Sequence, residues 1–235
     1  TIYCKSSGTL PNTGTDYFLF GNKAEAVAKE NNIMFSVNWV EGQKTGFFLD
    51  QRENRKLLGE FSKDKKVLNT FCYTGGFSIY AMNAGAELVT SVDISQKAVD
   101  LAASNMELNF PNANHKAVAD DVFNFMKEHT QQYDVIVLDP PAFAKSIKSK
   151  HTATQAYKRL NIAGLKALAP NGILFTFSCS QVIDDVLFYN TVAAAAIETG
   201  RNIRVLHKLE QGPDHPTNIY HPEGHYLKGL VLFVE

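Results

Sequence analysis

The most constraining feature of the sequence is a regular alternation of short apolar runs and helical patterns, which begins near Lys65. The apolar runs have the length of strands and lie at 66–71, 87–93, 115–120, 133–139 and 173–179. Such runs are typical of strands that are buried on both faces of a parallel sheet. We therefore predict an α/β fold in which helices cover both faces of a mostly parallel sheet.

Several boundaries can be predicted from individual residues. Ser95 is expected to cap the helix at 95–109, and the "PNG" at 170–172 is expected to form a sharp turn before the strand at 173–179. The final segments, 202–211 and 225–234, are predicted to form an antiparallel pair of long strands.

The first 50 residues look different, because they are rich in strand patterns without the regular helices. Strands are expected at 16–21 and 33–42, and the charged piece at 22–31 is expected to be a turn or one helical turn. Asp50 is a candidate N-cap for the helix that follows. The chain also starts at Thr1 rather than at a methionine, which leads us to expect a fragment of a longer protein.

Composition narrows the class of protein. Among the 235 residues 45% are hydrophobic and 20% are charged, as in an ordinary soluble globular protein, and the net charge of −1 argues against a general nucleic-acid binder. Cys4, Cys72 and Cys179 form no CxxC pair, so we expect no metal, no disulfide framework and a cytoplasmic location. No apolar run approaches the roughly 20 residues of a membrane span, so no membrane partner is expected.

Glycines and acids follow the first three predicted strands of the alternation. The first strand leads into "NTFCYTGGFS", where Gly75 and Gly76 let the backbone approach a ligand, although the pattern is not the GxGxxG of dinucleotide loops. Asp93 ends the second strand and can bind ribose hydroxyls or simply cap the next helix. Asp120 and Asp121 end the third strand, where a carboxylate can hold an adenine amino group. The combination favours S-adenosylmethionine (SAM) over NAD.

The next two strands end in chemically distinctive segments. "LDPPAF" contains two prolines that stiffen the backbone, so Asp139 and nearby carbonyls can face a planar base, although a simple strand-ending turn is the alternative. "TFSCSQ" contains Cys179, which is either a small core residue or a nucleophile. From Pro140 to Ile183 the chain has several lysines and no Asp or Glu, which indicates either a solvated helix face or a surface that meets phosphates.

Several segments together resemble the bacterial large-subunit (23S) ribosomal RNA cytosine-5 methyltransferases. These segments are "GQKTGFFLDQRENR", "LNTFCYTGGFS", "VDISQKAVDLAASN", "DDVF", "DVIVLDPPAFAKS", "FTFSCS" and "DHPTNIYHPEGHYLKG". The resemblance runs from about residue 40 to the end of the chain. It implies a Rossmann-like class I methyltransferase fold: a mostly parallel seven-stranded sheet with an antiparallel final strand, preceded by a small β-hairpin segment. It also implies that the family's N-terminal PUA domain is absent, with 1–50 the remnant of a small central β-rich domain and 51–235 the methyltransferase domain.

The resemblance also implies roles for individual residues. Contacts to SAM are implied for Tyr73, Thr74, Gly75, Gly76, Asp93, Asp121, Asp139, Gln51 and Arg52. The catalytic residues implied are Cys179, as the nucleophile, and Asp139. Substrate contacts are expected at Pro140, Pro141, Phe143, Lys145 and Lys148. The expected partner is large-subunit ribosomal RNA, and the oligomeric state is left open, with a homodimer as one option.

The expected chemistry explains why a cysteine is needed. Cytosine C5 is a poor nucleophile, and addition of a thiolate to C6 moves electron density to C5; a base then removes the C5 proton and the thiolate leaves. Guanine N7 already has a lone pair, so Cys179 favours cytosine C5 over the alternative of guanine-N7 methylation. A non-catalytic module that binds SAM and RNA is a further alternative. Ala142 occupies the position where more distant cytosine-5 enzymes have a second cysteine, and no residue is identified as the base.

Overall fold

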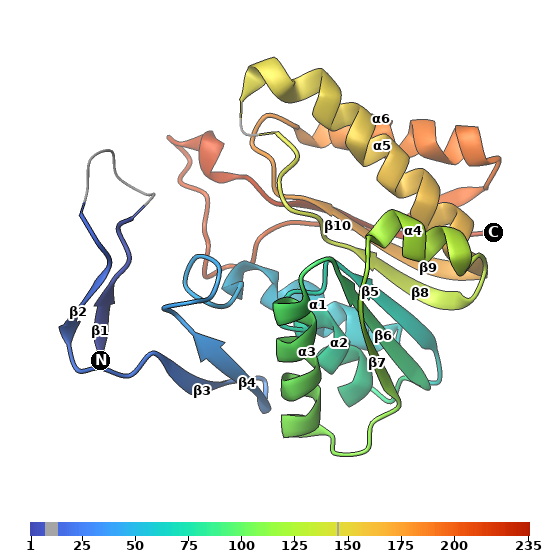
Figure 1. Ribbon diagram of the computed structural model, residues 1–235. Coiled ribbons are helices and arrows are strands. Elements are labelled where there is room, and N and C mark those ends of the chain that lie inside the picture. Colours follow the sequence, from blue (N-terminus) through green and yellow to red (C-terminus); the bar gives the residue numbers. More distant parts are fainter. Residues whose placement is uncertain (8–13, 145) are drawn as a thin grey trace. The chain divides into compact units, whose positions relative to one another are not determined.

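The computed structural model describes residues 1–7, 14–144 and 146–235. It divides into two compact units, Thr1–Leu49 and Asp50–Glu235 (Figure 1). Among the described residues, no helix is both long and apolar enough to cross a membrane.

The first unit consists of two antiparallel pairs of strands. The strands are β1 (Ile2–Cys4), which pairs with β2 (Tyr17–Phe20), and β3 (Glu25–Glu30), which pairs with β4 (Ile33–Asn38). The prediction of a turn or helical turn at 22–31 is wrong, because 25–30 form a strand. Asn31 and Asn32 have φ values of 49° and 69°, so they form the tight turn that folds β3 back onto β4. Pairing with β4 outweighs the weak strand preference of "EAVAKE".

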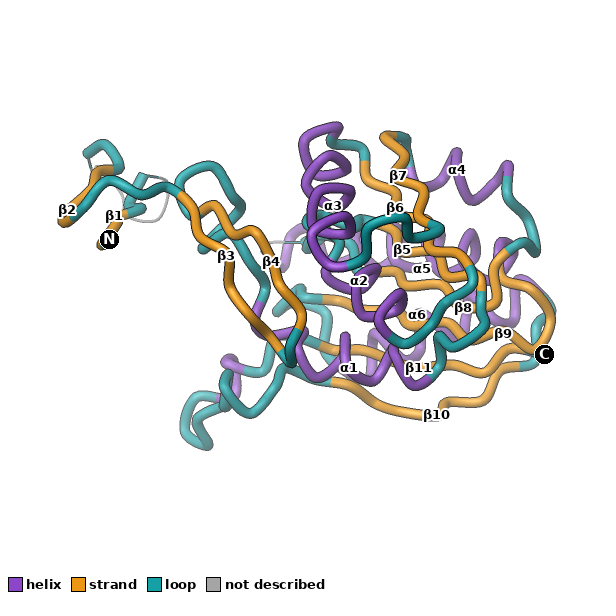
Figure 2. Tube along the Cα trace, turned by 90° about the horizontal axis from the view of Figure 1, so that it is seen from below, coloured by secondary structure: helices purple, strands orange, loops and turns teal. Residues whose placement is uncertain are grey.

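The second unit contains a seven-stranded sheet in the order β10-β11-β9-β8-β5-β6-β7. Its strands are β5 (Lys66–Thr70), β6 (Leu88–Asp93), β7 (His115–Ala119), β8 (Tyr133–Leu138), β9 (Leu168–Ser178), β10 (Ile203–Leu209) and β11 (Lys228–Val234). β5 to β9 are parallel, whereas β11 is antiparallel to both β9 and β10. In Figure 2, β7 and β10 lie at opposite edges of this sheet. The predicted mostly parallel sheet with an antiparallel final strand is confirmed.

Helices cover both faces of the sheet. They are α1 (Arg52–Glu60), α2 (Gly76–Asn83), α3 (Gln96–Asn109), α4 (Val122–Glu128), α5 (Lys150–Ala167) and α6 (Asp185–Thr199), with short 3-10 turns η1 (Leu49–Gln51), η2 (Ile147–Ser149) and η3 (Pro222–Gly224). Figure 1 shows α4, α5 and α6 on one face and α1, α2 and α3 on the other. This arrangement explains why the central strand β8 is buried along almost its entire length.

The largest core cluster lies between the sheet and helices α4, α5 and α6. Tyr157 from α5 and Phe188 from α6 are almost fully buried, and they belong to one cluster with Ile136, Leu138 and Leu174 from the central strands. Complete burial of a side chain of this size is worth roughly 1.5–3 kcal/mol. The apolar runs that predicted the sheet are therefore also the source of its stability.

Two local predictions are wrong and one is confirmed. Asp50 does not cap α1, because it lies in the preceding 3-10 turn and its carboxylate accepts a hydrogen bond from Tyr226. Gln51 occupies the N-cap position, and its side chain makes no capping hydrogen bond. The segment at 170–172 does not break the chain before a strand; it forms a bulge inside β9, where Asn171 has a φ of 60°. Ser95 caps α3 as predicted, and its hydroxyl accepts from the N–H of Ala98.

Candidate active site

The predicted site residues are gathered at one edge of the sheet because parallel strands end on the same side. The loop after β5 carries Tyr73 to Gly76, β6 ends at Asp93, and β8 and β9 lead into Asp139 and Cys179. In an open α/β sheet this carboxyl edge is where ligands bind.

The loop after β5 has an unusual backbone that is tied tightly to its neighbours. Phe71, Tyr73 and Gly75 have positive φ values of 52°, 46° and 79°, separated by residues with negative φ. Three N–H groups of this loop bind protein acceptors: that of Cys72 donates to the carbonyl of Val92, that of Tyr73 to Asp93, and that of Gly75 to the carbonyl of Cys72. A side chain at Gly75 would place Cβ 3.0 Å from Cβ of Ala102, so the loop packs directly on α3.

Asp93 holds this loop in place. Its Oδ2 accepts from the N–H of Tyr73 at 3.1 Å, and its Oδ1 accepts from the N–H of Ser95 at 3.0 Å. Asn105 of α3 supports the same loop by donating to the carbonyl of Thr74 at 3.0 Å. The carboxylate therefore links the ends of β5 and β6, and its remaining lone pairs can still accept from a ligand.

Asp121 has a structural task in this structure. Its Oδ1 accepts from the N–H groups of Phe123 and Asn124, which makes it the N-cap of α4. Arg52, the other peripheral residue of the predicted site, pairs with Asp214 at 3.1 Å and with Glu53 at 2.9 Å.

The carboxyl groups of Asp50 and Asp139 interact near the carboxyl ends of the parallel strands. Gln51 donates to Oδ1 of Asp139 at 3.1 Å, and its own side-chain oxygen accepts from Asn54 at 2.7 Å. Asp50, which is only 7% exposed, accepts from the hydroxyl of Tyr226 at 2.7 Å through Oδ2. Its Oδ1 is buried and has no hydrogen-bond partner among the described residues.

Burial changes the acidity of Asp139. Loss of solvent, followed by repulsion from Asp50, raises the pKa of Asp139 to about 7, although the bond from Gln51 and the nearby Arg55 oppose the rise. Near neutral pH the group is thus divided between its carboxylate and carboxylic acid forms. It can accept a hydrogen bond in the first form and donate one in the second.

Cys179 follows the last residue of β9 and is half-buried. Its Sγ lies 3.9 Å from the carbonyl oxygen of Pro140, so the thiol and the Pro-Pro segment are neighbours. Cys72 differs, because burial and the charge of Asp93 raise the pKa of its thiol far above the ordinary value. Of these two thiols, only Cys179 has the exposure that a nucleophile needs.

The remaining predicted substrate residues are spread over different environments. Pro140 is buried, Pro141 is exposed, and the ring of Phe143 packs against the ring of Tyr157 at 4.7 Å. Lys148 is exposed in η2, whereas Lys145 lies outside the described residues.

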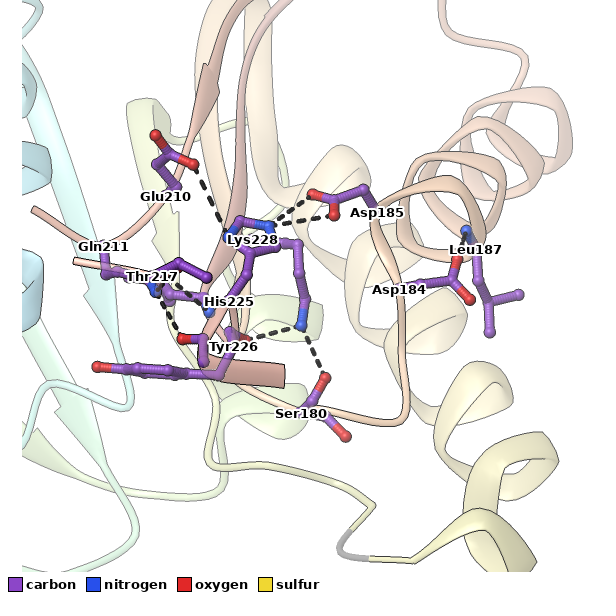
Figure 3. Close-up of polar contacts among 12 residues, drawn as sticks. Ser180, Asp184, Asp185, Leu187, Glu210, Gln211, Thr217, His225, Tyr226 and Lys228 are labelled. Carbon is purple, nitrogen blue, oxygen red and sulfur yellow. Dashed lines mark hydrogen bonds and ion pairs between the residues drawn. The ribbon is translucent and has the colours of Figure 1, made fainter. Parts of the chain in front are cut away.

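Two residues of the site were missed by sequence analysis. Tyr226 lies just before the final strand β11 and donates to Asp50 through its hydroxyl. Lys228 begins β11 and donates to the carbonyl of Ser180, which lies just after β9 (Figure 3). The sequence did contain a signal for Lys228, because a single charged residue in the apolar run "YLKGLVLFV" indicates a lysine with a specific role. Nothing in the sequence near Tyr226 indicated that it would bind Asp50, which is far away in the chain.

The site suits a ligand that carries positive charge. Asp50 offers a buried oxygen without a partner among the described residues, and burial together with the charge of Asp50 raises the pKa of Asp139. SAM carries a sulfonium and an ammonium group, so a pair of carboxyl groups and a hydrogen-bonding loop fit it. Among the described residues no group of His, Cys, Asp or Glu side chains could hold a metal ion.

Comparison with known proteins agrees with this fit. The family model for S-adenosylmethionine-dependent methyltransferases matches residues 11–231, so the chain belongs to this family. SAM, the cofactor predicted from the strand ends, is thereby confirmed. The Rossmann-like fold is confirmed by a candidate SAM-dependent methyltransferase from Streptococcus mutans, which is 28% identical with a TM-score of 0.82 and covers 93% of this chain and 58% of that one. A solved candidate methyltransferase at 29% identity and the same coverage and TM-score was crystallised with S-adenosylhomocysteine (SAH).

Curated relatives are more similar in sequence. "Ribosomal RNA large subunit methyltransferase I" of Aeromonas hydrophila is 42% identical over 232 residues, which is 97% of this chain and 58% of the relative. The protein of the same name from Vibrio vulnificus is 44% identical over 214 residues, or 88% of this chain and 54% of the relative. The resemblance to large-subunit ribosomal RNA methyltransferases is confirmed. The chain spans only a little over half the length of these relatives.

Proposed function

We propose that this protein methylates C5 of a cytosine in large-subunit ribosomal RNA, with Cys179 as the nucleophile. The observation that carries the proposal is that a half-buried thiol and a carboxyl group of raised pKa follow the adjacent parallel strands β9 and β8. The curated relatives, which are named as large-subunit ribosomal RNA methyltransferases, support the RNA substrate.

The residues proposed to hold SAM end or follow the strands β5, β6, β7 and β8, or lie at the start of α1. Asp93, the Tyr73–Gly76 loop and Asp121 would hold the nucleoside of SAM in this proposal, and Asp139, Gln51 and Arg52 would complete the cofactor site. Bound SAM supplies the electrophilic methyl group for C5. Asp50 is a further candidate, because its buried Oδ1 lacks a partner among the described residues.

The protein's own residues account for activation of the base. The thiolate of Cys179 forms a bond to C6, and the electron pair of the C5–C6 double bond becomes available at C5. Asp139 in its acid form donates a hydrogen bond to the ring and stabilises the charge that develops there. After methylation a base takes the C5 proton, the double bond re-forms, and the sulfur leaves with its electron pair. The lysines at 145 and 148 and the Pro140–Phe143 segment are proposed to face the RNA, which presents the target base unstacked.

The proposal is tested by trapping the covalent adduct. RNA that carries 5-fluorocytosine has fluorine in place of the C5 proton, so the final elimination fails and the protein stays attached. We expect an adduct with SAM present that resists denaturing electrophoresis, and we expect Cys179→Ala to abolish it while Cys72→Ala and Cys4→Ala retain it.

Each other result points elsewhere. An adduct that persists in Cys179→Ala removes Cys179 as the nucleophile. Methylated guanine formed equally well by Cys179→Ala would support guanine-N7 chemistry, and binding of SAM and RNA without any methylation would support a non-catalytic module. The chain spans only part of the length of its relatives, so the same assay is repeated on a chain extended to their length. An adduct formed only by the longer chain indicates weak RNA binding by this one, whereas no adduct in either contradicts the proposed chemistry.

A further inference from the structure

Lys228 is a buried cation in an apolar strand. It begins β11, pairs with Ser178 of β9 in the sheet, and is only 3% exposed. Its Nζ donates to the carbonyl oxygen of Ser180 at 2.8 Å and to that of Tyr226 at 2.7 Å (Figure 3). An ammonium group has three N–H donors, so these two bonds leave one donor for another acceptor.

Burial of a lysine without an anionic partner is costly, and the residue usually responds by losing its proton. Loss of solvent lowers the pKa of Lys228, while the nearby negative charges of Asp185, Cys179 and Asp184 raise it. Within the described part of the chain, however, Lys228 makes no ion pair with a carboxylate. Its two bonds go to neutral carbonyl groups, and one of these belongs to the residue that directly follows Cys179.

The two nearby carboxylates are already engaged. Asp184 caps α6 by accepting from the N–H of Leu187 at 2.8 Å, and Lys150 lies 3.5 Å from its other oxygen. Asp185 pairs with His225 at 3.1 Å (Figure 3). Their charges still act on Lys228, and the sulfur of Cys179 is the third negative group that does so.

We propose that Lys228 is a positioning residue that stabilises the thiolate of Cys179 through its charge. The S–H proton of Cys179 leaves to solvent, the electron pair stays on sulfur, and Lys228 remains an ammonium group throughout. Its bond to the carbonyl of Ser180 also holds the backbone of the cysteine in place. The importance of this role for catalysis rests on the proposed function, whereas the effect on the thiol does not.

Other titratable groups also face this pair of residues. The charge of Cys179 acts on Tyr157 of α5 and on Tyr226, both of which have pKa values raised mainly by burial. His225 lies between Asp185 and Glu210. Asp139 acts on Tyr157 from the end of β8. Lys228 donates directly to the backbone of Ser180, the residue after Cys179. Its removal is therefore expected to have the largest effect on the pKa of the Cys179 thiol.

The test is the pH dependence of alkylation of Cys179 by iodoacetamide in the full 235-residue chain, followed by mass spectrometry of each cysteine peptide. Reaction rates from about pH 6 to about pH 10 cover both sides of the ordinary thiol pKa of about 8.5. We expect a wild-type midpoint below that value. Lys228→Met should raise it by about one pH unit, which lowers the rate at neutral pH about tenfold. Lys228→Arg should restore most of the difference.

Two controls isolate the charge from the structure. Lys208→Met removes an exposed lysine from the adjacent strand β10 and should leave the midpoint unchanged. Cys72, which is 5% exposed, reports folding in the same experiment, because it reacts only when the core opens. Lys228→Gln keeps a donor without the charge, and it should behave like Lys228→Met.

The proposal is overturned by an unchanged midpoint in a folded Lys228→Met or Lys228→Gln chain. If both variants unfold, a wild-type midpoint at or above about 8.5 overturns it without any substitution, and a lower one supports it. The assay uses neither RNA nor SAM. If the midpoint depends on Lys228 but no RNA adduct forms, only the proposed cytosine chemistry is contradicted. If the adduct forms but the midpoint does not depend on Lys228, only the proposed role of Lys228 is contradicted.

Discussion

At Asp139, burial and a neighbouring carboxylate act in the same direction on one side chain. Both raise its pKa, to about 7, and the hydrogen bond from Gln51 offsets only part of this rise. The sequence motif indicated an acid facing a planar base, but it contained no information on protonation. That property comes first from burial and then from the charge of Asp50, which is distant in the chain.

The raised pKa predicts a pH dependence of stability. Between about pH 4 and about pH 7 an unfolded Asp139 loses its proton while the folded one keeps it, so the free energy of unfolding of the wild type falls as pH rises through this window. Asp139→Asn removes that slope. We expect the stability of the variant minus that of the wild type to rise from pH 4 to pH 7 and then to level off.

Urea unfolding at a series of pH values measures this difference. Asp50→Asn is the matched variant: it removes the repulsion but keeps the carboxyl group of Asp139, so the upper end of the window should move below pH 7. A difference between Asp139→Asn and wild type that stays constant across the window would contradict the raised pKa.

The pairing of β11 with β9 decides where Tyr226 and Lys228 lie. Gly229 stands opposite Phe177 in this antiparallel pair. A Cβ added at Gly229 would lie 2.6 Å from two carbons of the Phe177 ring and 3.0 Å from Cβ of Leu209. Phe177 is buried and packs against Phe77 of α2, so its ring has little room to move.

Gly229→Ala is therefore predicted to destabilise the protein by about 1–3 kcal/mol, the usual range for overpacking of a core. Gly59→Ala in α1 is the matched control, because its new Cβ meets nothing closer than 3.5 Å and a helical alanine is favoured over glycine by about 0.5–1 kcal/mol. Equal midpoints of urea unfolding for Gly229→Ala and the wild type would show that β11 can shift at no cost.

The whole molecule brings together charges that the sequence keeps apart. The acid-free stretch from Pro140 to Ile183 appears uniformly basic in the sequence, yet Lys150 pairs with Asp184 and Lys158 pairs with Glu198 across the fold. The basic character available to RNA is correspondingly smaller. The carboxyl ends of the parallel strands likewise bring loops from distant segments together into one candidate cofactor site.

Cofactor binding at that edge should stabilise the entire second unit, since a ligand that binds only the folded state shifts the folding equilibrium. We expect SAM or SAH to raise the melting temperature of the wild type in a concentration-dependent manner. Asp93→Ala loses the bonds to Tyr73 and Ser95 that hold the loop, so the shift should be lost at moderate ligand concentrations, with or without RNA. Asp100→Ala, on the exposed surface of α3, should behave like the wild type. An undiminished shift in Asp93→Ala would refute its assignment to the cofactor site.

The sequence alone determined the features that repeat or that depend on neighbouring residues. Apolar runs predicted the parallel strands, because burial on both faces requires them. Turn glycines and strand-end acids predicted the cofactor, because parallel strands end at one edge. Local propensity failed at 25–30, where pairing with β4 decided the outcome, and at Asp50, whose carboxylate serves Tyr226 instead of capping α1.

Only the tertiary structure decided which side chains share an environment. The pKa of Asp139 is raised by burial and by the charge of Asp50, and the surroundings of Cys179 include Lys228, which is supplied by the final strand. Desolvation and Coulomb interaction act through space and are strong only in a buried site. For this reason "TFSCSQ" and "LDPPAF" indicated which groups are present, whereas their acidity could be read only from the folded chain.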